Sequence, residues 1–227
     1  MQNTAILIQA RMSSTRCPGK VLADLKGSPL IERLLQSLEK NEHALPVILC
    51  TSTETSDDLV ADFCSKRGTP FFRGSLNNVA ERFIHAAEAF KLEHLIRISG
   101  DSPWFNVSLA NQAIETYFKT LPDICCNIYP RSFPKGQSLE VFSTELLKRF
   151  YTKMDASDQE HVTPIFYRHG KDLKIENVAN TSQMNHLDLS IDTPEQLAKT
   201  REIFEHLEKP HWQYSIAEIL DLFKLKP

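Results

Sequence analysis

The stretch Ala5–Lys20, AILIQARMSSTRCPGK, begins with a short apolar run and continues into a loop that is rich in cations. Its apolar part, Ala5–Ile8, predicts a buried strand of an α/β protein. Parallel strands of such proteins end at a crevice where loop amides and the next helix N-terminus point outward, and phosphate groups bind there. The loop after this strand is therefore a candidate site for a polyanion.

This loop supplies both charge and hydrogen-bond donors. Its three cations are Arg11, Arg16 and Lys20. Between them lie the hydroxyl groups of Ser13, Ser14 and Thr15, which can donate to a triphosphate. The Gly-Lys pair at 19–20 is not part of a P-loop, because that motif requires Gly at position 14 and Ser or Thr at position 21, where this chain has Ser and Val. A solvated basic loop is the other interpretation of these residues.

Length, charge and cysteine content limit the classes of protein to consider. The 227 residues suit one α/β domain, 1–227, with an insertion expected around residues 129–180. A net charge of −3 argues against binding of nucleic acid through a basic face, so any anion site must be local. The chain shows no leader pattern and no apolar run long enough to span a membrane, which predicts a cytoplasmic protein. Five cysteines without a C-x-x-C pair favour reduced thiols.

Strand-like and helix-like segments alternate along the first half of the chain. The expected strands are Ala5–Gln9, Val47–Thr51, Pro70–Phe72 and Leu95–Ser99. Each is followed by a segment with helical spacing, which predicts a mostly parallel sheet between helices. Three other expected elements contain or directly precede candidate site residues. They are a helix over Asn78–Phe90, a helix over Glu160–Arg168 and a strand at Leu187–Ile191.

Two aspartates stand directly after expected strands. Asp101 follows the strand at 95–99, and Asp192 follows the strand at 187–191, so both are expected at the sheet edge that carries the basic loop. Mg²⁺ prefers one or two carboxylates together with phosphate oxygens and water, and two such aspartates suit a magnesium-loaded triphosphate. The alternatives are a turn formed by Asp101 and a helix N-cap formed by Asp192 or Thr193.

Five separate blocks form an ordered pattern along the chain. They are IQARMSSTRCPGKVL at 8–22, RGS at 73–75 with NVAERF at 78–83, RISGDSP at 97–103, EHVTP at 160–164 and IDTPEQL at 191–197. Together they resemble the SpsF-like cytidylyltransferases, a branch of the sugar nucleotidyltransferases that also contains the KDO and acylneuraminate cytidylyltransferases. Cys17 departs from that family, which usually has Leu or Ile there.

The resemblance implies both a fold and a reaction. The implied fold is a Rossmann-like, three-layer α/β fold of the nucleotide-diphospho-sugar transferase type, with a mostly parallel mixed sheet. The implied reaction is Mg²⁺-dependent transfer of CMP from CTP to an acidic or amino sugar, with release of pyrophosphate, for a surface or spore coat polysaccharide. A homodimer is expected by the same analogy, and the 129–180 insertion is expected to contribute to sugar binding or dimer contact.

The resemblance also implies roles for individual residues. The implied nucleotide-binding residues are Ala10, Arg11, Ser13, Ser14, Arg16, Lys20, Arg73 and Arg82. The implied catalytic residues are Arg11, Lys20 and Asp101, and the implied metal ligands are Asp101 and Asp192. The implied sugar-binding residues are Arg131, Glu140 and His161. Surface solvation is the alternative explanation of Arg73 and Arg82, and a structural role is the alternative for His161.

One departure from the family leaves the acceptor open. The family commonly has Asp two residues before the Glu of its D-V-E-V-F string, and this chain has Ser138 there. A non-catalytic nucleotide-binding module is therefore one alternative function. A nucleotide-sugar-dependent glycosyltransferase is another, although no Asp-x-Asp metal motif follows the expected central strand.

Overall fold

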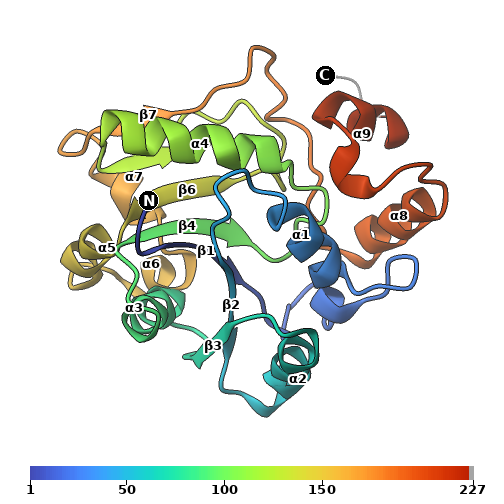
Figure 1. Cartoon of the computed structure of the whole chain (residues 1–227), viewed down its shortest axis with the longest axis horizontal. Helices are drawn as coiled ribbons and strands as arrows, with labels where there is room; N and C mark the ends of the chain where they lie inside the picture. The colour runs from blue at the N-terminus through green and yellow to red at the C-terminus, as the bar shows by residue number, and fades with distance from the viewer. Residues whose placement is uncertain (225–227) are drawn as a thin grey trace.

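The apolar run near the N-terminus forms β1 (Thr4–Gln9) inside a seven-stranded sheet (Figure 1). This computed structural model describes residues 1–224. The parallel neighbours of β1 are β2 (Val47–Ser52) and β4 (His94–Ser99), and β3 (Phe71–Gly74) pairs with β2. The other strands are β5 (Ile124–Cys126), β6 (Leu139–Ser143) and β7 (Ile175–Asn177). The order is β3-β2-β1-β4-β6-β5-β7, with β6 antiparallel to both neighbours, which confirms the predicted mostly parallel mixed sheet.

Helices cover both faces of the sheet, so the fold has three layers (Figure 1). The helices on one face are α1 (Leu30–Leu38), α2 (Asp58–Arg67) and α4 (Val107–Thr120). Those on the other face are α3 (Val79–Ala89), α5 (Thr144–Tyr151) and α7 (Pro164–Arg168), with α6 (Ala156–His161) against α3. Ile6 and Ile8 enter the first core, and Ala5 and Leu7 enter the second. This alternation is expected for a central strand that is buried on both faces.

A third core joins the C-terminal helices to the loop that follows β1. Helices α8 (Pro194–Glu205) and α9 (Ile216–Leu222) pack in this core with Trp104. Cys17 and Ile191 are buried in the same core. The core therefore holds the basic loop against the segment that precedes the second predicted aspartate. Cys17 serves there as a small apolar side chain.

Two elements differ from the prediction. The helix expected over Glu160–Arg168 is divided into α6 and α7, because Val162 has a φ of 70° and Pro164 begins a new helix. The segment Leu187–Ile191, which was expected to be a strand, is irregular. Its one β-bridge pairs Asp188 with Lys135. Its backbone passes so close to Gly136 that a Cβ there would lie 2.7 Å from the nitrogen of residue 190. The strand prediction was wrong because this backbone is positioned by its close contact with Gly136, which is distant in the sequence.

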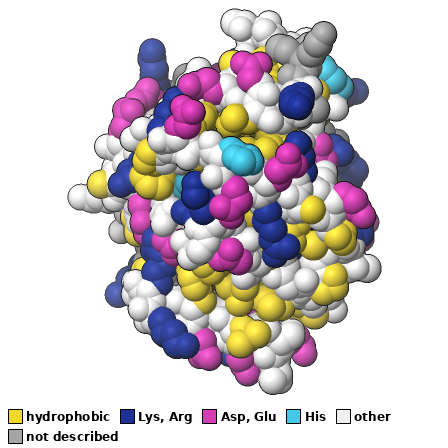
Figure 2. All heavy atoms as spheres, turned by 90° about the vertical axis from the view of Figure 1, so that its right-hand side faces the viewer, with side chains coloured by type: hydrophobic (Ala, Val, Ile, Leu, Met, Phe, Trp, Pro, Cys, Tyr) yellow, Lys and Arg dark blue, Asp and Glu magenta, His cyan; other side chains and the backbone are white. Residues whose placement is uncertain are grey.

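No large single-sign charge patch covers the described residues on the face that Figure 2 shows. Acidic and basic side chains are intermingled on the face that lies on the right-hand side of Figure 1 (Figure 2). Among residues 1–224, none of the helices combines the length and the apolar composition needed to cross a bilayer. All five cysteines are free and buried.

His211 is a buried histidine whose protonation opposes folding. It begins the short 3-10 helix η3 (His211–Gln213), and its Nε2 donates a 2.7 Å hydrogen bond to the Arg33 carbonyl on α1. Burial lowers its pKa from 6.5 to about 4. The unfolded chain takes up this proton at a higher pH than the folded chain does. The stabilising contribution is therefore complete above about pH 6.5 and is lost as the pH falls toward 4.

His211→Gln is expected to reduce the loss of unfolding free energy that occurs as the pH falls from 7 to 4. Between pH 7 and pH 4, protonation of this histidine should cost the wild type about 3 kcal/mol of unfolding free energy that the variant does not lose. Urea unfolding of both proteins at the two pH values measures the difference. His206→Gln, at an exposed position, is the control and should follow the wild type. Equal acid losses in wild type and His211→Gln would show that other groups govern the transition.

Candidate active site

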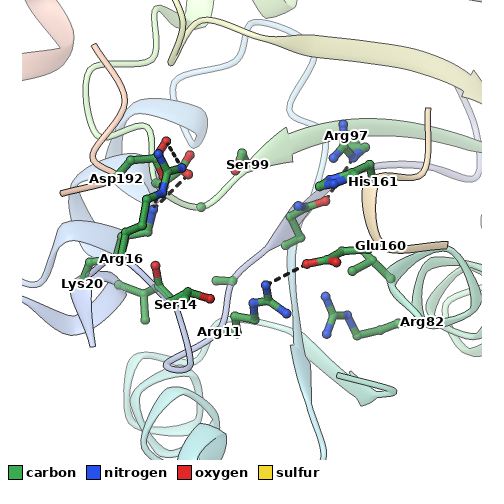
Figure 3. A pocket seen from close by; sticks show the side chains of 17 residues that line it. Arg11, Ser14, Arg16, Lys20, Arg82, Arg97, Ser99, Glu160, His161 and Asp192 are labelled. Atoms are coloured by element: carbon green, nitrogen blue, oxygen red, sulfur yellow. Dashed lines mark hydrogen bonds and ion pairs between the residues drawn. The ribbon is translucent and has the colours of Figure 1, made fainter. Parts of the chain in front are cut away.

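A cavity of about 450 Å³ opens at the carboxyl ends of β1 and β4 (Figure 3). The loop after β1, the turn after β4, helices α3 and α6 and the segment before α8 contribute to its wall. Nine of the residues predicted for the site line it: Ala10, Arg11, Ser14, Arg16, Lys20, Arg82, Asp101, His161 and Asp192. Segments that are far apart in the sequence therefore surround a single space.

The backbone around the cavity is held in place by a glycine and a buried acid. Gly100 donates to the Gln9 carbonyl at 2.9 Å. A Cβ at position 100 would lie 2.7 Å from that carbonyl oxygen and 2.9 Å from the Ala10 Cβ, so only glycine allows this approach of β1 and β4. Asp57 then fixes the start of the basic loop, because its carboxylate accepts the Met12 amide at 2.7 Å.

Lys20 connects the basic loop to both predicted aspartates. Its ammonium nitrogen lies 3.2 Å from Asp101 Oδ2 and 2.9 Å from Asp192 Oδ1, and it also donates to the Ile191 carbonyl. The Lys20 side chain is 11% exposed. Ion pairs with so little water contact are screened much less than surface pairs. The loop and two acids that are remote from it in the sequence therefore meet at one point.

The carboxylate of Asp192 is free to bind cations because its neighbour caps the helix. Thr193 Oγ1 accepts the Gln196 amide at 3.3 Å, and Gln196 Oε1 accepts the Thr193 amide at 3.0 Å, which makes a capping box at the start of α8. Arg16 adds a 2.9 Å ion pair to Asp192. Burial alone would raise the pKa of Asp192, but the hydrogen bond and charge of Lys20, together with those of Arg16, lower it below its ordinary value.

Two further arginines line the cavity on the side of α3 and α6 (Figure 3). Arg11 forms a 2.9 Å ion pair with Glu160 of α6. Arg82 is 1% exposed, donates from Nη1 to the Ser75 carbonyl at 3.0 Å and has no partner for its buried Nε. The interpretation of Arg82 as a solvated surface residue is therefore wrong, and burial lowers the pKa of its guanidinium. A buried cation with an unused donor favours a polar or anionic ligand.

Comparison with known proteins identifies the family of this chain. A family model described as cytidylyltransferase matches residues 5–219, nearly the whole chain. This chain belongs to the cytidylyltransferase family. It is therefore an enzyme of the nucleotidyltransferase class.

Individual proteins share their sequence or their fold with this chain. SpsF of Bacillus subtilis (strain 168), named as a spore coat polysaccharide biosynthesis protein, is 30% identical over 100% of this chain and 96% of its own length. The 3-deoxy-manno-octulosonate cytidylyltransferase of Chloroherpeton thalassium is 29% identical over 54% of this chain and 49% of its own length. A solved cytidylyltransferase from Leptospira borgpetersenii has 24% identity and a TM-score of 0.92, with 99% of this chain and 94% of that chain covered. The predicted Rossmann-like nucleotidyltransferase fold is confirmed.

Arg97 and Glu160 also line the cavity of this cytidylyltransferase and were not among the predicted site residues. Arg97 lies in β4, and its Nε donates to Gln9 Oε1 at 3.0 Å. Its Nη1 lies 3.2 Å from Oε2 of Glu140, which stands directly opposite in the antiparallel pairing of β4 with β6. A charged residue inside the apolar strand HLIRIS was the available indication, because charges are rarely buried without a partner or a function.

The predicted residues that do not line the cavity are Ser13, Arg73, Arg131 and Glu140. Ser13 is exposed, and Arg73 lies in β3, where it forms a 2.7 Å ion pair with Asp58. Glu140 is 1% exposed and lies behind Arg97. Arg131 is half-buried and has an unpartnered Nη1. The structure therefore places these four residues apart from the group that surrounds Lys20.

Proposed function

We propose that this cytidylyltransferase transfers CMP from CTP to a hydroxyl group of a sugar. In this step the sugar oxygen attacks the α-phosphorus, the bond from that phosphorus to the bridging β-phosphate oxygen breaks, pyrophosphate leaves and the hydroxyl proton passes to solvent. The observation that supports the proposal most is the position of Lys20 between Asp101 and Asp192 at the strand ends. A cation and two carboxylates at one point suit a triphosphate with its metal ion.

The cations of the basic loop would bind the β- and γ-phosphates. Arg11, Arg16 and Lys20 are each paired with a carboxylate in the structure, so phosphate oxygens would replace carboxylate oxygens as their partners. These three cations would then stabilise the negative charge that develops on the leaving pyrophosphate. Arg82, which lines the cavity from α3, would add its positive charge near the nucleotide.

Asp101 and Asp192 would hold a Mg²⁺ ion in the same proposal. Both carboxylates bind the Lys20 ammonium, so their oxygens already surround a cation. Within residues 1–224, no cluster of three or more His, Cys, Asp or Glu side chains could enclose a metal. Two carboxylates with phosphate oxygens and water are the ligand set that Mg²⁺ prefers, so the residues fit this ion. When bound, Mg²⁺ would offset the charge that builds on the α-phosphate oxygens.

Pyrophosphate release from CTP tests this proposal. The assay uses the purified protein with Mg²⁺, CTP and a panel of 2-keto sugar acids, amino sugars and neutral sugars. We expect release that requires CTP and a sugar together and that stops when EDTA removes the metal. Sugar transfer from a preformed nucleotide sugar would instead favour the glycosyltransferase. Binding of CTP without turnover on any sugar would favour the non-catalytic module.

We also propose a use for the product. The name of the similar Bacillus subtilis protein supports a role for the CMP-sugar in a surface or spore coat polysaccharide. The reaction would take place in the cytoplasm, where CTP is made. A homodimer is part of the same proposal, and light scattering of the purified protein tests it.

A further inference from the structure

Glu160 is an acid of the cavity wall that the proposed reaction does not use. It lies in α6, and its carboxylate forms a 2.9 Å ion pair with Arg11 of the basic loop (Figure 3). The two other acids that line the cavity, Asp101 and Asp192, hold the Lys20 ammonium instead. Among the side-chain hydrogen bonds of residues 1–224, the one with Arg11 is the only one that Glu160 makes. The carboxylate of Glu160 therefore serves Arg11 alone.

The charges around Arg11 favour an anion at this point. Burial lowers the pKa of the Arg82 guanidinium, and the positive charge of Arg11 lowers it further, so the two arginines repel each other. The carboxylate of Glu160 reduces this repulsion because it neutralises Arg11. Carboxylate and phosphate oxygens form the same charge-assisted hydrogen bonds with a guanidinium. In the empty cavity, Glu160 thus occupies a position that also suits a phosphate group.

The position of α6 does not depend on the contact with Arg11. Asp158, in the same helix, forms an ion pair with Arg168 of α7. Val162, which follows α6, is fully buried in the second core. When Arg11 turns to a ligand, α6 should therefore stay in place and keep the Glu160 carboxylate close to the guanidinium. Such a tethered group competes at a high effective concentration.

We propose that Glu160 competes with phosphate groups for Arg11 and thereby speeds the departure of pyrophosphate. The inference rests on the proposed cytidylyl transfer, in which Arg11 binds the β- and γ-phosphates. CTP tolerates the competition because its cytidine also binds the protein. Pyrophosphate has lost that connection once the bond to the α-phosphorus is broken, so the returning carboxylate displaces it more easily.

Binding of inorganic tripolyphosphate tests the competition without any turnover. Isothermal titration calorimetry in the presence of EDTA compares the wild type with Glu160→Gln, which keeps the shape of the side chain and removes its charge. The variant should bind tripolyphosphate about tenfold more tightly, the size of one charge-assisted hydrogen bond. Glu88→Gln is the matched control, because it removes the same charge from an exposed ion pair with Lys148 and should bind as the wild type does.

A double-mutant cycle shows whether Glu160 acts through Arg11. In the Arg11→Gln background, Glu160→Gln should change tripolyphosphate affinity by less than about twofold, because the contested guanidinium is gone. General repulsion between Glu160 and any anion in the cavity would instead give the same tightening in both backgrounds.

Product inhibition tests the effect on pyrophosphate. The inhibition constant of pyrophosphate in the CTP-dependent reaction should fall about tenfold in Glu160→Gln, because changes in affinity appear mostly in the dissociation rate. A residue that only supported the fold would weaken this binding when it is changed. An inhibition constant equal to or higher than that of the wild type would overturn the role in pyrophosphate release.

The outcomes separate this assignment from the proposed function. Unchanged or weaker tripolyphosphate binding in Glu160→Gln, or equal tightening in both backgrounds, would overturn the role of Glu160, and cytidylyl transfer would stand. Tighter binding without pyrophosphate release on any sugar would overturn cytidylyl transfer, and the competition at Arg11 would stand. No tripolyphosphate binding by wild type and variant alike would contradict the role of the basic loop at the phosphates and, with it, this assignment.

Discussion

Lys20→Met should lower kcat for CTP-dependent pyrophosphate release about 10³-fold, as expected when one preorganised charge at a reacting group is lost. Methionine keeps the approximate length of the side chain and removes its charge. A unit-charge contact near 4 Å is worth about 4 kcal/mol at an effective dielectric of about 20, before desolvation. The 11% exposure of Lys20 indicates that water would replace little of this interaction. Initial rates at saturating CTP and sugar measure the effect.

Lys26→Met is the matched control for this prediction. Lys26 is exposed and donates to the backbone carbonyl of Glu205, away from the cavity, so its loss should leave the rate unchanged. Near wild-type turnover in Lys20→Met would contradict the role of Lys20 at the phosphates.

A second measurement on the same variant does not depend on turnover. The Lys20 ammonium occupies both carboxylates in the structure, so it should compete with a divalent cation when no nucleotide is present. Electron paramagnetic resonance of Mn²⁺ should therefore show tighter binding to Lys20→Met than to the wild type. Equal Mn²⁺ affinity would show that the ammonium does not control access to Asp101 and Asp192.

The place of the site was predictable because it follows from a rule about parallel strands. Lys20 and Asp101 come shortly after strands that the alternating pattern identified, and the carboxyl ends of such strands share one edge. Asp192 was placed correctly at this edge although Leu187–Ile191 is not a strand. The expectation of a strand failed because the backbone there is positioned by Gly136 and the third core, which are long-range contacts.

The environments of the arginines were not predictable, because they depend on tertiary packing. Arg73 and Arg82 lie within ten residues of each other in the sequence, yet Arg73 pairs with Asp58 and Arg82 is buried in the cavity wall. The contact of Arg97 with Glu140 requires the register of β4 against β6, two strands separated by a helix and β5. No local period in the sequence encodes that register.

Asp101→Asn should abolish measurable turnover and leave the fold intact. Asparagine keeps the shape of the side chain and an oxygen for the Ser102 hydroxyl, which donates to Oδ1 at 3.2 Å. The Ile191 amide still donates to the carbonyl of residue 101 at 2.9 Å, so the backbone contact between the strand end and the α8 segment remains. The charge alone is lost. A metal ion contributes several kcal/mol to phosphoryl chemistry, so the rate should fall about 10³-fold or more.

The measurement that checks Asp101→Asn combines pyrophosphate release with thermal denaturation and CTP binding. Asp172→Asn, at a side chain that is 78% exposed, makes the same chemical change away from the cavity and should behave as the wild type. Asp192→Asn should lose turnover as Asp101→Asn does, because both carboxylates converge on the same cation. A low Tm together with low activity would indicate damage to the fold and not to the chemistry. Near-normal turnover with a normal Tm would remove Asp101 from the mechanism, and its contact with Lys20 would then be a structural ion pair.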